Sequence, residues 1–378
     1  MVPTIGTILG ETYRIVRPLA DGGCGDVYVA IHARLGSEVA VKVLHPSLAG
    51  NAQALARLQR EADIMSALRH PHIVQILDFN VTEHGVPYLV MELLEGRSLT
   101  EGAASGLPFE PRAAIHIVEQ IAHALEAAHA HGIVHLDLKP DNVILVSTDG
   151  RDDFVKVIDF GISQASWRDR PADEPLITGT PEYMAPEQAS GLTEEIDHRT
   201  DQFALASLSY WLLTGHEPFN GTDPNALLHQ VISEIQQPPS QRAPWLGKGV
   251  DAVINRGMSK RSCARFPDVM AFADALCDAV ELVASDRRLV PRPVSEPVSD
   301  QIAPPAGLSE RDTLKFIRKT KRATVGRAPG VVLVALAVAA GVWFFPATRS
   351  TARATWHRAT AHARRAIVAV STSGAREP

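Results

Sequence analysis

The stretch His135-Leu-Asp-Leu-Lys-Pro-Asp-Asn142, together with Val155-Lys-Val-Ile-Asp-Phe-Gly161 downstream of it, decides the fold of this chain. The first stretch is polar and combines aspartates, a lysine and an asparagine within a few residues. The second is an apolar, strand-like run that ends in a further aspartate. Any one of these residues alone is most often part of an ordinary turn. All of them in this order rarely arise by chance, so we interpret the rest of the sequence in relation to these two stretches.

The sequence on either side of this frame differs in its periodicity. Residues 13–95 are rich in strand-like runs, with one helical segment at about 52–68. After Leu99 the pattern is mainly helical, with long periodic segments at 111–131 and 201–213. A small β-rich lobe followed by a larger helical lobe predicts an α+β fold with a cleft between the lobes. The strand-like runs are 13–20, 26–33, 38–44, 73–79 and 87–94.

Composition excludes several classes of protein. The chain has 378 residues, of which 45% are hydrophobic and 21% charged, as is normal for a folded protein with a sizeable core. A net charge of -6 gives no basic character, so we expect no nucleic-acid partner.

Three cysteines do not make a disulfide framework and fit a reducing compartment. The first ten residues lack a basic start and an apolar run, so we expect no cleavable signal peptide. The 15 histidines include no paired-ligand motif, so we interpret them as structural or solvated.

The sequence after residue 284 has a different character. Prolines and charges crowd together at 285–302, which predicts an extended linker, and a basic stretch follows. No charged residue lies between Arg327 and Arg349, and the centre of this span, 331–345, is apolar. As a helix at about 1.5 Å per residue, the whole charge-free span between Arg327 and Arg349 would be roughly 30 Å long, close to the hydrocarbon thickness of a bilayer. A buried core helix is the alternative, but no second domain follows that could bury it. We therefore expect a membrane span.

A glycine-rich turn near the N-terminus suits phosphate binding. Residues 19–27 read L-A-D-G-G-C-G-D-V, and glycines let backbone N–H groups approach phosphate oxygens without a Cβ in the way. An ordinary hairpin is the alternative. Lys42 follows in an apolar strand, where a cation needs a counter-charge. Glu61 can provide it and orient Lys42 on the α/β-phosphates, unless Glu61 pairs instead with Arg57 or Arg60 at the surface.

The polar stretches contain the groups that phosphoryl transfer requires. That reaction needs an aspartate to accept or orient a hydroxyl, oxygen ligands for Mg²⁺ and a cation near the moving phosphoryl group. Asp137 suits the first role. Asn142 and Asp159 are hard oxygen ligands suited to Mg²⁺. Lys139 can reach the γ-phosphate.

The sequence resembles the protein kinase family, and more narrowly its bacterial membrane-anchored serine/threonine kinases, over about residues 10–282. Residues 179–187, G-T-P-E-Y-M-A-P-E, look like the end of a kinase activation segment. The resemblance implies that Glu187 pairs with Arg265. It also implies that Asp201 is the buried aspartate that steadies the catalytic loop, and that His135 has a scaffolding role there.

The resemblance also implies the activity and its site. It implies a bilobal kinase that phosphorylates serine and threonine hydroxyls of proteins, with ATP and Mg²⁺, or Mn²⁺ in its place. Met91 falls at the gatekeeper position, Glu92 and Leu94 offer backbone hydrogen bonds to adenine, and Thr180 shapes the acceptor pocket. The phosphate-loop positions are Ala20, Gly22, Gly23 and Gly25, and the adenine walls are Val27, Ala40 and Leu145.

The implied organisation has four parts. The kinase domain spans 10–284, with an N-lobe at about 10–94 and a C-lobe at about 95–284. A linker at 285–328, a transmembrane helix at 329–347 and a short basic tail at 348–378 follow. Both flanks of the span are basic, so the positive-inside rule does not orient it. The kinase domain is placed on the cytosolic side because ATP is cytosolic. The family also leads us to consider a homodimer formed through the small lobe.

Two departures from the family pattern, and two other functions, are weighed. Ala20 replaces the first glycine of the phosphate loop, which weakens its flexibility a little. Leu136 stands where many kinases have an arginine that pairs with a phosphorylated residue. The enzyme is then either constitutively competent or gated by another contact. A pseudokinase usually loses part of the set Lys42, Glu61, Asp137, Asn142 and Asp159, which is complete here. A small-molecule kinase of the aminoglycoside type is disfavoured by residues 179–187.

Overall fold

The computed structural model describes most of residues 3–289, and contacts divide the chain into two units, Met1–Pro293 and Val294–Pro378. The following concerns the first unit. The described ranges are 3–20, 25–44, 52–103, 108–148, 151–160, 181–221 and 223–289. The predictions for Gly22, Gly23, Thr180, the span at 329–347 and the tail lie outside them.

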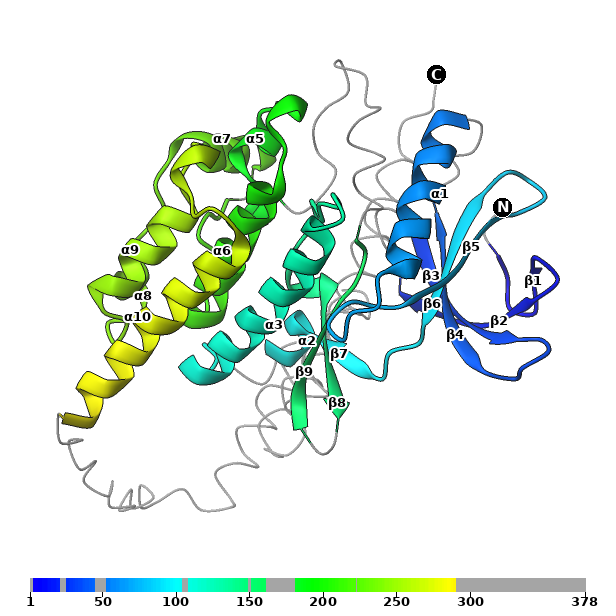
Figure 1. Cartoon of the computed structure of the whole chain (residues 1–378), viewed down its shortest axis with the longest axis horizontal. Helices are drawn as coiled ribbons and strands as arrows, with labels where there is room; N and C mark the ends of the chain where they lie inside the picture. The colour runs from blue at the N-terminus through cyan, green and yellow to red at the C-terminus, as the bar shows by residue number, and fades with distance from the viewer. Residues whose placement is uncertain are drawn as a thin grey trace, which may run out of the picture. The chain divides into compact units, whose positions relative to one another are not determined.

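The N-terminal lobe is one antiparallel sheet with a helix against it (Figure 1). The sheet has six strands in the order β1-β2-β3-β4-β6-β5. Helix α1 (Ala52–Ala67) follows β4 and packs against β5. The strands are β1 (Ile8–Leu9), β2 (Tyr13–Ala20), β3 (Gly25–His32), β4 (Glu38–Leu44), β5 (Ile76–Val81) and β6 (Pro87–Glu92).

The alternation of β4 explains why Lys42 faces the site. Successive side chains of a strand point to opposite faces. Val39, Val41 and Val43 therefore join one apolar cluster on one side of the sheet. Ala40 and Leu44 belong to the other cluster, which also contains residues of α1. Lys42 lies between Ala40 and Leu44 on that second face, toward the helical lobe.

The C-terminal lobe is mainly helical (Figure 1). Its central helix α6 (His198–Thr214) is buried from Thr200 to Thr214 and contacts α3, α9 and α10. The lobe also contains a three-stranded sheet in the order β7-β8-β9, and the polar loop at 135–142 directly precedes its middle strand, β8. The larger elements are β7 (Gly96–Ser98), α2 (Leu99–Ala103), α3 (Pro111–His129), β8 (Val143–Thr148), β9 (Arg151–Val157), α5 (Pro186–Ala189), α7 (Pro224–Ser233), α8 (Pro239–Arg242), α9 (Lys248–Gly257) and α10 (Val269–Leu289). Short 3-10 turns are η2 (Pro140–Asn142), η3 (Pro181–Tyr183), η4 (Thr193–Glu195) and η5 (Ser262–Ala264).

The two lobes are joined by backbone hydrogen bonds as well as by chain connection. The Val74 N–H donates to the Val157 carbonyl at 3.0 Å, and the Val157 N–H donates to the His72 carbonyl at 2.8 Å. Ile73 and Val157 form an isolated parallel bridge. The strand expected at 73–79 therefore begins only at Ile76, because the residues before it pair with β9 of the other lobe.

The C-terminal boundary also differs from the expectation. Helix α10 continues to Leu289, beyond the expected boundary at residue 284. The first proline after it is Pro291, and Arg287, Arg288 and Leu289 are good helix formers, so the helix continues until the prolines begin. Within the described residues, no helix has the length and apolarity needed to cross a membrane.

Candidate active site

A buried lysine of the small lobe is paired with an aspartate of the large lobe. Lys42 is 4% exposed. Its ammonium Nζ lies 2.8 Å from Asp159 Oδ1. A charge removed from water in this way is stable only with a partner. Asp159 is thus the partner that the structure gives Lys42, and the predicted pair with Glu61 on α1 stays a prediction.

The loop before β8 holds a second cluster of charged and polar groups. Lys139 Nζ donates to Asp137 Oδ2 at 2.7 Å. The Asn142 amide donates to the Asp137 carbonyl at 2.7 Å and to its Oδ2 at 3.1 Å. The same carboxylate oxygen is therefore shared by a cation and an amide. Asp137 is about a fifth exposed, at 22% of its side chain, so it remains accessible to a substrate hydroxyl.

Two hydrogen bonds place this loop beside Asp159. The Ile158 N–H donates to the Asn142 carbonyl at 3.0 Å. His135 Nε2 lies 2.9 Å from the Ile158 carbonyl, and its ring packs 4.6 Å from that of Phe160. Asp159 has a left-handed backbone, with φ at 68°, between these two anchored neighbours. The structure therefore brings Lys42, Asp137, Lys139, Asn142 and Asp159 into one connected site.

Hydrogen bonds to the buried carboxylate of Asp201 on α6 fix the main chain of this loop. This carboxylate is 1% exposed and accepts the N–H groups of His135 at 2.8 Å and Leu136 at 2.9 Å. His129 Nε2 lies 2.7 Å from it. Burial acts to raise the pKa of Asp201, but the hydrogen bond and charge of His129 and the contacts of His135 outweigh it, and the pKa is lowered. The expected scaffolding contacts of Asp201 and His135 are present.

An apolar wall lies next to Lys42. Ala40, Met91 and Leu145 are buried in one hydrophobic cluster, and Val27 and Leu94 pack against it. Ala40 pairs with Met91 across β4 and β6. These are the residues expected around adenine. The Glu92 N–H donates to the Gln75 carbonyl at 3.0 Å, so an adenine contact at Glu92 would use its carbonyl oxygen.

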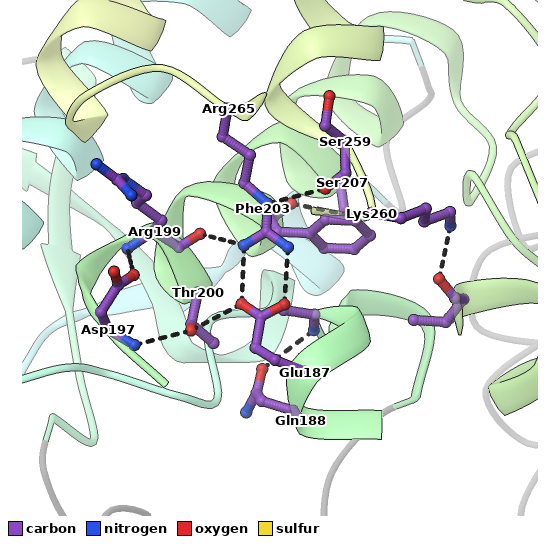
Figure 2. Close-up of polar contacts among 12 residues, drawn as sticks. Glu187, Gln188, Asp197, Arg199, Thr200, Phe203, Ser207, Ser259, Lys260 and Arg265 are labelled. Carbon is purple, nitrogen blue, oxygen red and sulfur yellow. Dashed lines mark hydrogen bonds and ion pairs between the residues drawn. The ribbon is translucent and has the colours of Figure 1, made fainter. Parts of the chain in front are cut away.

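The large lobe contains the ion pair expected from the sequence (Figure 2). Arg265 donates through Nη1 and Nη2 to the two carboxylate oxygens of Glu187, at 2.8 and 2.7 Å. Both residues are at least 96% buried. Thr200 also donates to Glu187 at 2.9 Å, and Arg265 donates to the Arg199 carbonyl at 2.7 Å. This two-pronged pair ties α5 to the segment before α10, and so holds the chain that follows residue 180.

The donor set fits a hard divalent cation. Asp159 supplies a carboxylate and Asn142 an amide, both oxygen ligands of the type that Mg²⁺ prefers. The hydrogen bond from the Ile158 N–H to the Asn142 carbonyl holds the residue before Asp159 against Asn142. Magnesium is usually held by one or two protein carboxylates together with substrate phosphates, so these two residues are enough.

The structure shows contacts that sequence reasoning did not identify. Lys156 Nζ donates to Glu92 Oε1 at 2.6 Å, which links β9 to the end of β6. Gln188 Nε2 donates to the Leu136 carbonyl at 2.9 Å. Each contact joins residues more than fifty positions apart, and no short motif indicates it. Ala20 lies exposed at the end of β2. Its predicted role in the phosphate loop stays a prediction.

A six-stranded lobe that presents a buried lysine to a polar loop of a helical lobe defines the class of two-lobed phosphotransferases. The protein kinase domain family matches residues 13–268, and the chain therefore belongs to the protein kinase family. Serine/threonine-protein kinase Pkn1 of Myxococcus xanthus is 41% identical over 277 residues, which cover 72% of this chain and 39% of Pkn1. Serine/threonine-protein kinase PknB of Mycobacterium leprae is 36% identical over 267 residues, covering 68% and 41% of the two chains. The matched region is thus about two fifths of the length of either relative.

The fold agrees with a solved structure of the same family. The kinase domain of Mycobacterium tuberculosis PknI superposes with a TM-score of 0.59 at 28% identity, covering 74% of this chain and 100% of that domain. The predicted two-lobed kinase fold is confirmed. The contact between Glu187 and Arg265 is confirmed as well.

Proposed function

We propose that this chain transfers the γ-phosphoryl group of ATP to serine and threonine hydroxyls of proteins. The observation that carries the proposal is the connected site of Lys42, Asp159, Asn142, Asp137 and Lys139 between the lobes. The family and the serine/threonine kinases named above support it. The narrower choice of Mg²⁺ rests on the donor set of Asn142 and Asp159.

Each residue has a role that follows from its contacts. With ATP bound, Lys42 would leave its pair with Asp159 to bind the α/β-phosphates, and Asp159 and Asn142 would hold the metal. A bound Mg²⁺ would neutralise charge on the phosphates. Asp137 accepts or orients the hydroxyl: the Lys139 and Asn142 donors both go to its Oδ2, and Oδ1 is the oxygen that would take the hydroxyl proton. Lys139 then stabilises the charge that develops on the moving group.

The test uses the full-length chain with labelled ATP, Mg²⁺ and a generic basic protein. The first prediction is that Asp137→Asn lowers transfer by about 10²-fold or more, since general-base catalysis typically contributes that much. ATP binding, followed by a fluorescent nucleotide analogue, should be retained. A matched control is Asp63→Asn, which changes an exposed aspartate on α1. A parent chain that binds ATP but transfers nothing would instead identify a pseudokinase.

We also propose that residues 329–347 anchor the chain in the cell membrane with the kinase domain in the cytoplasm. The support is the charge-free span between Arg327 and Arg349, with basic residues on both sides. Fractionation of cells that make the full chain tests this: a chain that stays soluble contradicts it. The homodimer rests on the family resemblance alone, and sedimentation of the detergent-solubilised chain at several concentrations would test it.

A further inference from the structure

Lys260 is a partly buried lysine whose ammonium is held by carbonyl oxygens and aromatic rings. It lies between α9 and η5. Its Nζ donates to the Val231 carbonyl at 2.6 Å and approaches the Gln230 carbonyl at 3.4 Å. The same atom lies 4.3 Å from the ring centre of Phe219 and 5.7 Å from that of Phe203. Figure 2 shows the Lys260 side chain beside the Phe203 ring, with a dashed contact at its ammonium.

The carbonyls that Lys260 approaches belong to the C-terminal end of α7. This helix ends at Ser233, and the last four carbonyls of a helix have no donor within it. The Glu234 N–H donates to the Gln230 carbonyl at 2.9 Å. Val231 is 0% exposed, so water cannot reach its carbonyl, and Lys260 is the donor that satisfies it. A cation at this position also opposes the partial negative charge of the helix end.

The surroundings of Lys260 make its charge costly. Burial, and secondarily the nearby Arg265, lower the pKa of Lys260 to about 8, against the raising effect of Glu234. On α7, His229 lies 3.8 Å from Glu234, and at the end of α9, Arg256 lies 4.0 Å from the centre of the Phe266 ring. At pH 7 the ammonium is still mainly charged. A cation that is retained where its charge is unfavourable is typical of residues with a function.

Helix α7 connects this contact to the catalytic loop. Its principal contacts are with α5 and η3. Its Leu228 packs on Met184 and on the two apolar residues that flank His135 in that loop. ATP would lie against the apolar wall beside Lys42, so a protein hydroxyl has to reach the loop along the large lobe. A shift of α7 therefore changes the surface that meets the protein substrate.

We propose that Lys260 is a positioning residue for the protein substrate: its charged ammonium fixes the C-terminal end of α7, and α7 places Met184 and the catalytic loop. Loss of the ammonium leaves the Val231 carbonyl without its donor, and the movement of the last turn reaches Met184 through Leu228. The apolar wall of the small lobe is not part of this chain of contacts. The inference rests on the proposed kinase function.

The first experiment measures transfer by full-length variants to a generic basic protein, with ATP and Mg²⁺. Lys260→Met removes the cation at nearly constant length and should lower kcat/KM for the protein by about tenfold, because small misplacements at a catalytic site are costly. The KM for ATP should stay within about twofold. Lys260→Arg keeps a cation and should return kcat/KM to within about threefold of the parent chain. The control is Lys248→Met, at an exposed lysine of α9, which should leave the rates unchanged.

A pH profile separates the charge of Lys260 from its packing. The parent ammonium loses its proton near pH 8, whereas an arginine stays charged. The neutral amine keeps a donor for Val231 but loses its attraction to the faces of Phe203 and Phe219. From pH 7.5 to 9, kcat/KM for the protein should therefore fall about threefold further in the parent chain than in Lys260→Arg. Superimposable profiles, or full activity of Lys260→Met, would overturn the inference.

Hydrogen exchange provides a measurement that does not depend on activity. The Glu234 amide, at the end of α7, should exchange faster in Lys260→Met than in the parent chain, while exchange in α1 of the small lobe is unchanged. Unchanged exchange in α7 would overturn the inference even if the chain transferred no phosphate. A parent chain without transfer but with the expected exchange difference would count against the proposed function alone. If Lys260→Met does not fold, exchange in the parent chain and in Lys260→Arg at pH 7.5 and 9 decides instead, after correction for the intrinsic effect of pH.

Discussion

At the scale of single residues, two buried cations of the described residues each have a specific carboxylate partner. Lys42 is paired with Asp159, and Arg265 with Glu187, and both cations are at most 5% exposed in their side chains. The two pairs differ in what they can do. The first joins the two lobes at the site through an ammonium–carboxylate contact of 2.8 Å, whereas the second is two-pronged and buried within one lobe. The first is therefore suited to exchange partners when phosphates bind, and the second to hold structure.

Removal of one partner from the buried pair should be strongly destabilising. We predict that Arg265→Met lowers the free energy of unfolding by about 3–5 kcal/mol, because the Glu187 carboxylate is left buried without its counter-charge. Urea denaturation of the parent and variant chains, followed by tryptophan fluorescence, measures this change. The control is Arg261→Met, which replaces an exposed arginine nearby and should cost under about 0.5 kcal/mol. Equal stabilities of the two variants would contradict the prediction.

At the scale of elements, local pattern predicted the strands best. The runs at 13–20 and 38–44 match β2 and β4 residue for residue. In β4 this follows from a nearly continuous buried run that contributes side chains to both faces of the sheet. The run at 73–79 was wrong at its start, since residues 73–74 pair across the lobes with Val157. Such a contact depends on the tertiary fold and leaves no mark on the local period.

The candidate site shows the same division between motif and contact. The motifs identified Lys42, Asp137, Asn142 and Asp159, and the structure brings them together. They did not identify Asp159 as the partner of Lys42, because the sequence offers several acidic residues and no distance. Sequence likewise gave no sign that Leu136 would be buried against Met184, since the apolar partners come from three distant segments.

The crossing of α9 with its neighbours makes a prediction at this scale. At Gly257 an added Cβ would lie 2.8 Å from Phe272 and 2.9 Å from Ala206, closer than real contacts allow. Gly257→Ala should therefore destabilise the chain by about 1–3 kcal/mol through overpacking, although alanine is the better helix former. Gly249→Ala lies on the same helix with an ordinary 3.7 Å contact to Ala279 and should be neutral or stabilising. Denaturant unfolding of both variants compares them; equal effects would exclude the close crossing.

At the scale of the whole kinase domain, the two lobes meet at a group of histidines. His72 Nδ1 lies 2.9 Å from the Val155 carbonyl of β9, and the His72 ring packs 4.8 Å from that of Phe154. The His70 ring lies 5.6 Å from the His72 ring. This contact lies directly beside the hydrogen bonds that join residues 72–74 to Val157. The contact between the lobes therefore includes two histidine side chains.

The charges around these histidines oppose their protonation. Burial lowers the pKa of His72, and the nearby His123, Lys156 and His116 lower it further, against the raising effect of the Val155 hydrogen bond. Burial likewise lowers the pKa of His70, with contributions from His72, His123 and Lys156. Among the described residues, the carboxylate that faces this group is that of Asp153 on β9, whose Oδ2 lies 3.8 Å from His116 Nε2. Both histidines are therefore neutral at pH 7.

Acid should accordingly loosen the contact between the lobes. Because the folded pKa of His72 lies below its unfolded value near 6.5, the unfolded chain binds more protons as the pH falls. Its stabilising contribution is complete above about pH 6.5 and is lost as the pH falls toward the folded pKa. We predict that the melting temperature falls between pH 7 and pH 5, and that the fall is smaller in His72→Gln, which keeps an N–H donor but does not titrate. His84→Gln, at an exposed turn of the small lobe, should behave as the parent chain does. Scanning calorimetry at the two pH values distinguishes them, and an equal fall in the parent and His72→Gln chains would show that this contact does not sense protons.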